Sequence, residues 1–406
     1  MPDALLDMID RFAGIGGSPG GGVRRLTGSA EDGAARRLFA QEAEQRGAVV
    51  HVDPVGNMFA TFATAPAADT TVLVGSHLDS QPTGGRFDGA YGVLAGLDAA
   101  AALAAEGGLR HNLTVVNWTN EEGACFQPSL TGSSVYTGKY TPDFALGLAD
   151  RMGRSLGACL EDIGFRGAEP FPLRPLRYLE LHVEQGAELE DKGLRIGAVT
   201  TSWAARKITL CFTGVPAHTG PTPMGRRRDA LRAAAWAITE FHRLLEAEAA
   251  EVLLHWSAAK IVAEPDSPNV VASRVTVWFE IRNPDLAVAD AVGARFLAAI
   301  GPGVAALGIG QEVLGDEARA GTALDPEGVA VTLEVAQALG LPATAMRTIT
   351  GHDALALQAL VPSTLIFVPS VDGLSHNEAE LTLPEDLLNG AAVLRGVLRR
   401  FAMEAA

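Results

Sequence analysis

Residues 75–92 read GSHLDSQPTGGRFDGAYG, and the rest of the chain is organised around this stretch. The run before it, Thr71 to Val74, is short, apolar and β-branched, which is typical of a buried strand. His77 and Asp79 are therefore expected at the carboxyl end of that strand, where ligands and catalytic groups gather in open α/β sheets. Asp88 follows a turn and leads into an Ala/Leu-rich helix. One histidine and one aspartate are thus predicted at the two ends of a stiff loop.

The same pattern, an apolar run that ends in polar groups, recurs further along the chain. Residues 113–118 form such a run and are followed by Glu121 and Glu122, and a third run contains His182 near its end. A late loop adds His376. Imidazole and carboxylate groups are ligands that Zn²⁺ and related ions favour. Three strand ends and one loop therefore predict a metal site.

Two divalent ions a few ångströms apart need a bridging carboxylate to reduce their mutual repulsion. If Asp88 is the bridge, one ion takes His77 and His182 while the other takes Glu122 and His376. Four positive charges then meet two carboxylates and a hydroxide, which leaves a cationic cluster that suits a developing oxyanion. Each residue also has a structural explanation: a strand-end histidine is often a satisfied polar group, and Asp88 beside a glycine fits a helix cap. Their joint occurrence favours the metal site.

Glu121 and Glu122 are neighbours in the chain, so their side chains should diverge. One can be a ligand while the other moves protons, and amide hydrolysis requires a carboxylate that takes a proton from water and passes it to the leaving nitrogen. Glu121 is expected in that role. Asp79 lies two residues after His77, on the same side of an extended chain. Its carboxylate is expected to accept the other ring N–H of His77 and so fix the tautomer.

Composition limits the compartment and the partners. The formal charge of −16 and the lack of a basic block argue against nucleic acid or an anionic membrane surface as a partner. Cys125, Cys159 and Cys211 lack metal-finger spacing and fit a reducing cytoplasm better than a disulfide framework. The first 22 residues show no signal pattern, and no run approaches the ~20 apolar residues of a membrane helix. We expect a cytoplasmic protein.

The texture of the sequence changes near Arg206, where amphipathic helices at residues 229–251 and 285–300 alternate with short strands. The Ala/Leu-rich texture returns after Gly321. We therefore predict a catalytic domain at residues 1–206 and 321–406, interrupted by an α+β domain at residues 207–320. The glycine-rich segment at residues 14–22 has no leading strand and no following GK[ST], so it does not predict a phosphate-binding loop.

Seven motifs in order carry a resemblance to a known family: GSHLDSQPTGGRFDGAYGVLAG, TNEEGACFQPSLTGS, LHVEQGAELE, PAHTGPTPMGRRRDAL, EIRNPD, GHDA and SHNEAE. They resemble the hydantoinase/carbamoylase family of dinuclear metallo-amidohydrolases. That family includes N-carbamoyl-L-amino-acid hydrolases, β-ureidopropionases, allantoate amidohydrolases and ureidoglycolate amidohydrolases. The similarity runs from about Leu26 onward.

The resemblance implies an α/β fold, in which a metallopeptidase-like catalytic domain carries an inserted lid and dimerisation domain, in a homodimer with two divalent ions per subunit. Zn²⁺ is the first expectation, and Mn²⁺, Co²⁺ or Ni²⁺ meet the same ligands. By motif match the ligands are His77, Asp88, Glu122, His182 and His376, with Glu121 as general base and Asp79 behind His77. The matching substrate contacts are His218, Asn269, Arg282, Gln185 and the backbone at Gly351.

These positions have physical roles to match. Arg282 can pair in fork geometry with a substrate carboxylate, and His218 can donate to the oxyanion of a tetrahedral intermediate. Whether His218 serves its own subunit or the neighbouring one stays open. Two departures from the family concern the pocket: Cys125 stands where an arginine is usual, and residues 348–351 read TITG where SGAG is usual.

The expected reaction is cleavage of a linear C–N amide bond, first in an N-carbamoyl-L-α-amino acid to give the amino acid, CO₂ and ammonia. Allantoate, ureidoglycolate or a β-ureido acid is the alternative, followed by an N-acyl amino acid or peptide. A different class, a binding protein that kept the fold and lost catalysis, would show the loss of Glu121 or a ligand. All six positions are intact.

Overall fold

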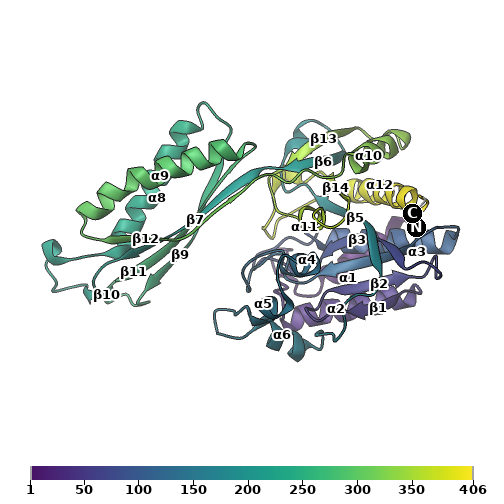
Figure 1. The fold of residues 1–406 in the computed structure, drawn as a ribbon, viewed down its shortest axis with the longest axis horizontal. Coiled ribbons are helices and arrows are strands. Elements are labelled where there is room, and N and C mark those ends of the chain that lie inside the picture. The colour runs from purple at the N-terminus through teal and green to yellow at the C-terminus, as the bar shows by residue number, and fades with distance from the viewer. Residues whose placement is uncertain (1, 405–406) are drawn as a thin grey trace. The chain divides into compact units, whose positions relative to one another are not determined.

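The computed structural model describes residues 2–404, which divide into two compact units (Figure 1). The larger unit holds the chain up to Thr201 and again from Ala323, and the smaller unit spans Ser202–Thr322. The smaller unit begins at Ser202, just before the strand that starts at Ala204. The change in sequence pattern near Arg206 falls within that strand. The roles of lid and dimerisation domain for the smaller unit stay predictions.

The larger unit is built on an eight-stranded sheet among its described residues, in the order β1-β2-β4-β3-β5-β14-β6-β13. Its strands are β1 Val49–Val52, β2 Met58–Phe62, β3 Thr70–His77, β4 Asn112–Trp118, β5 Arg174–Val183, β6 Ile196–Ser202, β13 Ala343–Thr348 and β14 Ser363–Val368. Its helices are α1 Pro2–Ala13, α2 Ala30–Gln45, α3 Ala90–Glu106, α4 Thr131–Tyr136, α5 Pro142–Gly147, α6 Leu156–Ile163, α7 Glu188–Asp191, α10 Pro326–Ala338, α11 Asp353–Leu357 and α12 Pro384–Ala402.

The central strands β4, β3, β5 and β14 run parallel. Every residue of β3, β4 and β14 is buried, because helices cover both faces and leave no solvated side. Alternate residues divide between two cores: Val72 and Val74 pack in the core that includes α1, α3 and α12, while Leu73 packs in the opposite core with residues of α11. This arrangement brings the carboxyl ends of the four strands to one edge of the sheet.

Two glycines allow α3 to begin beside the ligand-bearing strands. A Cβ on Gly89 would lie 2.3 Å from the His77 ring, and the residue has φ of +64°. A Cβ on Gly92 would lie 2.3 Å from the carbonyl oxygen of Leu181 in β5. A side chain at either position would push α3 away from the sheet edge.

The smaller unit is a four-stranded antiparallel sheet in the order β12-β7-β11-β9, covered by two helices (Figure 1). Its elements are β7 Ala204–Thr213, β8 Ala217–His218, η1 Met224–Arg226, α8 Ala230–Glu248, β9 His255–Glu264, β10 Val270–Val271, β11 Arg274–Asn283, α9 Leu286–Ala306 and β12 Gly310–Arg319. Buried residues alternate along β11 because one face of the sheet meets the helices. Among the described residues, one helix, α9, is long enough and apolar enough to span a membrane by length and composition alone. Here it packs on this sheet.

The smaller unit also shows where the sequence pattern was insufficient. β12 was not predicted, because its residues GQEVLGDEAR are polar and mostly exposed on an edge strand. In the larger unit α2 is capped, since the Ser29 hydroxyl accepts a hydrogen bond from the amide of Asp32 at the start of the helix.

Candidate metal centre

The predicted ligands lie at the carboxyl ends of neighbouring parallel strands. His77 is the last residue of β3, and His182 lies one residue before the end of β5. Glu121 and Glu122 follow the end of β4, and His376 follows β14 after a short 3-10 turn, η2 (Val371–Gly373). Because β4, β3 and β5 are adjacent and parallel, their ends bring side chains from distant parts of the chain to one place.

The first ligand group is His77, Asp88 and His182, and all three residues are buried. The Nε2 atom of His182 lies 3.2 Å from Asp88 Oδ1, and the Nε2 atom of His77 lies 3.7 Å from the same oxygen. Both imidazoles therefore face one carboxylate oxygen. The three ligand atoms lie within 4.8 Å of one another, which is close enough for one ion to contact all three.

The second group is Asp88, Glu122 and His376. The Nε2 atom of His376 lies 3.4 Å from Asp88 Oδ2 and 3.4 Å from Glu122 Oε2. Asp88 thus offers one oxygen to each group, which is the geometry of a bridging carboxylate. The same two groups were expected from the sequence. That they bind metal ions is a proposal.

Both buried imidazoles expose Nε2 because their other nitrogen is occupied. The Nδ1 atom of His77 lies 2.9 Å from the carbonyl oxygen of Asp79, and the Nδ1 atom of His182 lies 2.8 Å from that of Val183. A carbonyl oxygen only accepts, so each Nδ1 carries the proton. The amide of Gly89 donates to His182 Nε2 at 3.2 Å, which also requires a lone pair there. This neutral tautomer is the one that binds metal.

The role expected for the Asp79 carboxylate needs correction. The ring N–H of His77 meets the backbone oxygen of Asp79, whereas its carboxylate lies 3.7 Å away. The carboxylate instead accepts the backbone N–H groups of Glu121 and Glu122, both at 3.3 Å, and the hydroxyl of Thr27 at 2.9 Å. Because Leu78 to Ser80 lie outside the strand, the alternation of an extended chain does not hold there, and the backbone oxygen of Asp79 is nearer the ring than its carboxylate. Asp79 therefore fixes the segment that carries both glutamates.

Glu121 and Glu122 diverge as expected. The Oε2 atom of Glu121 lies 3.5 Å from His77 Nε2 in the first group. The Oε2 atom of Glu122 lies near His376 in the second group, and Gln81 donates its backbone N–H to Oε1 at 3.1 Å and its side-chain amide to Oε2 at 2.8 Å. Glu122 is thus held in place, while Glu121 reaches toward the ion site.

Charge at this edge fits a cationic occupant. Burial raises the pKa of Glu121 well above its ordinary value, and the carboxylates of Asp353 and Glu122 raise it further. Burial likewise raises the pKa of Glu122, with Asp88 adding to the effect. Crowded buried carboxylates are stable when cations compensate them, so the donor set fits divalent ions.

A third group, Glu180, His182 and His352, does not make a separate metal site. His182 already directs Nε2 to the first group and Nδ1–H to a carbonyl. The ring of His352 instead packs edge-on against that of His182, with centroids 4.6 Å apart, and its Nε2 pairs with the Thr350 hydroxyl at 2.7 Å. His352 therefore supports the orientation of His182.

The comparisons with known proteins agree with this geometry. Residues 73–400 match Peptidase family M20/M25/M40. The chain belongs to this family. It is 37% identical to an N-carbamoyl-L-amino-acid amidohydrolase of Rhizobium meliloti, over 97% of this chain and 94% of that one, and 31% identical to an allantoate amidohydrolase of Bacillus subtilis, over 98% of each.

A solved structure is similar over its whole length. The amidase of the hydantoinase/carbamoylase family from Burkholderia vietnamiensis has a TM-score of 0.90 and 37% identity, covering 100% of this chain and 98% of that one. The resemblance stated from the seven motifs is confirmed, as are the α/β fold and the enzyme class of hydrolase. Family M20 enzymes depend on metal, and the ligand groups fit that dependence.

Two expected substrate contacts lie in the larger unit of this M20 chain. Gln185 has φ of +59°, and its amide donates to Asp88 Oδ2 at 3.0 Å and to the Ser375 hydroxyl at 3.1 Å. The structure therefore places Gln185 on the bridging carboxylate. Gly351 directly precedes His352, whose ring packs against that of His182 in the first ligand group.

The other three lie in the smaller unit, where His218 and Asn269 are neighbours and Arg282 lies apart from them. His218 in β8 pairs in register with Val270, next to Asn269, and both His218 and Asn269 are exposed. Arg282 lies eight residues beyond Arg274, the first residue of β11. At ~3.3 Å per residue this is roughly 26 Å along the strand.

Sequence reasoning missed residues that support the ligands: Gln81, His352, Ser375 and Glu380. Glu380 was within reach of inference, because it is an acid four residues after His376 in the same motif. The glycine-rich segment also has a structural role, since a Cβ on Gly22 would lie 2.6 Å from the Cα of Glu378. It packs against the loop that carries His376, and no phosphate-binding role is needed to explain it.

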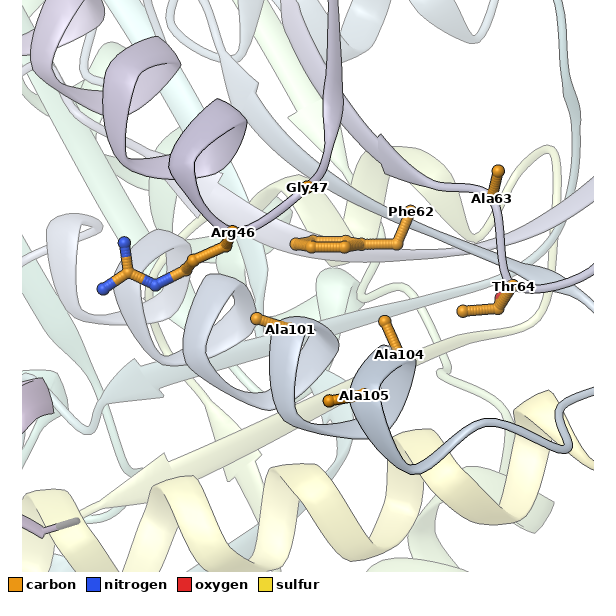
Figure 2. A pocket seen from close by; sticks show the side chains of 8 residues that line it. All are labelled: Arg46, Gly47, Phe62, Ala63, Thr64, Ala101, Ala104 and Ala105. Atoms are coloured by element: carbon orange, nitrogen blue, oxygen red, sulfur yellow. The ribbon is translucent and has the colours of Figure 1, made fainter.

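The cavity in Figure 2 is separate from the ligand groups. It has a volume of about 340 Å³ and lies between the end of α2, the end of β2 and one side of α3. Its lining is Arg46, Gly47, Phe62, Ala63, Thr64, Ala101, Ala104 and Ala105. Arg46 is already paired with Glu42, and no predicted site residue lines the cavity.

Proposed function

We propose that the protein is a metal-dependent amidohydrolase that converts an N-carbamoyl-L-amino acid and water into the L-amino acid, CO₂ and ammonia. The observation that carries this proposal is the pair of ligand groups that share Asp88, with Glu121 beside the first of them. The similarity to the Rhizobium meliloti amidohydrolase over nearly the whole chain supports the substrate class.

We propose that the two groups hold two divalent ions, with Zn²⁺ as the first candidate. When bound, such ions activate water and polarise the scissile carbonyl. His77 and His182 serve one ion, Glu122 and His376 the other, and Asp88 both. Mn²⁺, Co²⁺ or Ni²⁺ would suit the same nitrogen and oxygen ligands.

Glu121 acts as general base and then as general acid. It takes a proton from the attacking water and delivers it to the leaving nitrogen, and its raised pKa favours holding that proton between the two steps. Asp79 supports this role, because its carboxylate fixes the backbone of Glu121 at 3.3 Å. The hydrogen bond from its backbone to Asp79 therefore fixes the position of Glu121 without any contact to a metal ligand.

Arg282 binds the carboxylate of the substrate. It lies on β11 beside Glu280, whose Oε1 accepts from Nη2 at 2.9 Å and from Nε at 3.0 Å. This pairing holds the guanidinium in a fixed orientation, and the planar fork matches a carboxylate. Gln185 and the backbone at Gly351 contribute contacts from the larger unit.

His218 and Asn269 serve the site of a partner subunit in a homodimer. Arg282 lies roughly 26 Å along β11 from Arg274, at the strand end that follows the paired β8 and β10 in the chain, and this length exceeds that of a small substrate. If His218 and Arg282 touch the same substrate molecule, they must come from different copies of the chain. Donation from His218 to the oxyanion then makes each site depend on both subunits.

A mixed-subunit experiment tests this arrangement. Glu121→Gln and His218→Ala chains, each inactive alone, are dissociated, mixed in equal amounts and reassembled. If His218 acts across the dimer, mixed dimers contain one complete site, and activity recovers to roughly a quarter of the wild-type value at random mixing. If no activity returns although mixed dimers form, His218 acts in its own subunit.

The substrate is tested by comparing turnover of N-carbamoyl-L-methionine with that of allantoate after chelation and metal addition. We expect faster turnover of the N-carbamoyl amino acid. Faster turnover of allantoate would favour the alternative that the Bacillus subtilis relative represents. If neither compound, nor ureidoglycolate, is hydrolysed by metal-loaded protein, the proposed function is wrong.

We further propose a cytoplasmic location and a small-molecule substrate that carries both a carboxylate and a ureido or amide group. The formal charge of −16 supports the exclusion of nucleic acid and anionic membranes as partners. Fractionation of cells that express the tagged chain tests the location. Recovery with the membrane fraction would contradict it.

A further inference from the structure

Two of the three segments that supply the second ligand group are joined by one buried carboxylate. Glu380, which is 4% exposed, accepts the backbone N–H groups of Phe87 and Asp88 on Oε1, both at 3.1 Å. Its Oε2 atom accepts the hydroxyl of Ser375 at 2.9 Å. The segments lie 292 residues apart in the chain, and the side chain connects the residue before His376 to the backbone of Asp88.

The surrounding chain is shaped to admit this carboxylate. A Cβ on Gly85 would lie 2.0 Å from Glu380 Oε1, so the carboxylate fills the space that a side chain at residue 85 would need. On the other side, the Ser375 hydroxyl accepts from the Gln185 amide at 3.1 Å, and the same amide donates to Asp88 Oδ2 at 3.0 Å. Asp88 is therefore held at its backbone and at its carboxylate by one connected set of hydrogen bonds.

We propose that Glu380 is a positioning residue that keeps Asp88 and His376 at the separation that one divalent ion requires. The inference rests on the proposed function, because it concerns the second ligand group. Glu380 has no ligand role of its own, since its two oxygens are committed to three donors. It acts through Asp88 and Ser375, and partners of this kind change metal affinity by about 10- to 100-fold when they are removed.

The chain offers a matched control in Asp53, which is 6% exposed. Its Oδ1 atom accepts the backbone N–H groups of Val55 and Asn57 at 3.0 and 2.9 Å, and its Oδ2 atom accepts the Asn57 amide at 2.8 Å. The bonding is the same as at Glu380: one oxygen takes two backbone donors and the other takes a side-chain donor. Asp53 lies in the turn between β1 and β2 and bonds to neither ligand-bearing segment.

The test compares the wild type with Glu380→Gln, Ser375→Ala and Asp53→Asn as full-length metal-free proteins. Zn²⁺ binding is measured by competition with a chromophoric chelator, together with the melting temperature before and after loading, and kcat and KM at two Zn²⁺ concentrations. We expect two ions in the wild type. In Glu380→Gln the affinity for the ion of the second ligand group should fall about 10- to 100-fold. The value of kcat should recover in excess Zn²⁺, while KM stays unchanged.

Asp53→Asn should change the melting temperature without changing the affinity for either ion. Ser375→Ala should weaken the same ion as Glu380→Gln, by a smaller factor, and it keeps the test valid if the Glu380 variant does not fold. Wild-type affinity for both ions in Glu380→Gln or, failing that, in Ser375→Ala would overturn the inference. A wild type that binds no Zn²⁺ would instead refute the proposed function.

Discussion

Carboxylates in the two units have opposite charge surroundings. At the sheet edge of the larger unit, burial and the neighbouring carboxylates of Asp353 and Glu122 raise the pKa of Glu121 well above its ordinary value. In the smaller unit, the guanidinium of Arg206 holds the pKa of Asp316 below its ordinary value through two hydrogen bonds of 2.7 and 2.9 Å. One site collects like charges, and the other pairs unlike ones.

The difference separates function from structure. The pair of Arg206 and Asp316 is compensated within the chain and requires no bound ion. The edge that holds Glu121, Glu122 and Asp88 costs stability unless cations compensate the carboxylates. Elsewhere the chain compensates a carboxylate with a guanidinium. An edge that keeps several carboxylates without such a partner is therefore explained by chemistry rather than by stability. The predictions below change one side of this comparison at a time.

Removal of metal should have the largest effect. Thorough chelation should reduce hydrolysis below detection, and Zn²⁺ or Mn²⁺ should restore it. Chelation should also lower the melting temperature, since an ion at 1,000 times its dissociation constant stabilises the folded state by about 4 kcal/mol. Activity assays and thermal unfolding before and after chelation measure both effects. Full activity after exhaustive chelation would remove the basis of the metal mechanism.

Glu121→Gln should have the next largest effect. The substitution keeps the shape and removes the proton carrier, so kcat should fall by about 10²- to 10⁴-fold while both ions and the substrate still bind. Steady-state kinetics and calorimetric binding of N-carbamoyl-L-methionine measure the two properties separately. The control is Glu188→Gln. Glu188 is an exposed glutamate of α7 that pairs with Lys192 at 2.7 Å, so this substitution should leave kcat unchanged.

The same variant distinguishes an enzyme from a binding protein. If Glu121→Gln lowers neither turnover nor binding, another residue carries the proton. If the wild type binds substrate without turnover, the binding-protein alternative is correct.

How far the sequence predicts this edge depends on the kind of interaction. His77 and His182 could be placed because buried apolar runs locate strand ends, and parallel strands bring those ends together. The contacts of Asp79 and Glu380 could not, because each joins segments whose relative position only the folded backbone fixes. β12 escaped prediction because an exposed edge strand has no apolar face to reveal it.

Arg282→Lys should have an intermediate effect on substrate binding. A lysine keeps the charge but cannot form the two parallel hydrogen bonds of a guanidinium with a carboxylate. Since a charge-assisted hydrogen bond contributes about 1.5–3 kcal/mol, KM should rise roughly 10- to 100-fold with little change in kcat. Arg274→Lys, at the other end of β11 with Glu264 at 3.5 Å, is the matched control and should leave KM unchanged. Equal KM values in both variants would exclude Arg282 from the substrate site.

Asp316→Asn should have the smallest effect and tests the other side of the comparison. The pair is partly exposed, so its loss should lower the free energy of unfolding of the smaller unit by about 0.5–1 kcal/mol near neutral pH. Because the folded pKa of Asp316 lies below its unfolded value of about 4, this stabilisation is fully present above that value and disappears as pH falls through the lower folded pKa. The difference between the wild type and the variant should therefore be largest near pH 7 and should shrink as pH falls through the acid range.

Denaturant unfolding of metal-free protein, followed by tryptophan fluorescence, suits this measurement. Four tryptophans, Trp203, Trp236, Trp256 and Trp278, lie in the smaller unit, whereas Trp118 lies in the larger one. The signal therefore reports mainly the unit that contains the substitution. A loss of several kcal/mol, or a difference that does not shrink as pH falls, would show that Asp316 does more than pair with Arg206. The contrast between a purely structural carboxylate and the carboxylates at the sheet edge would then no longer hold.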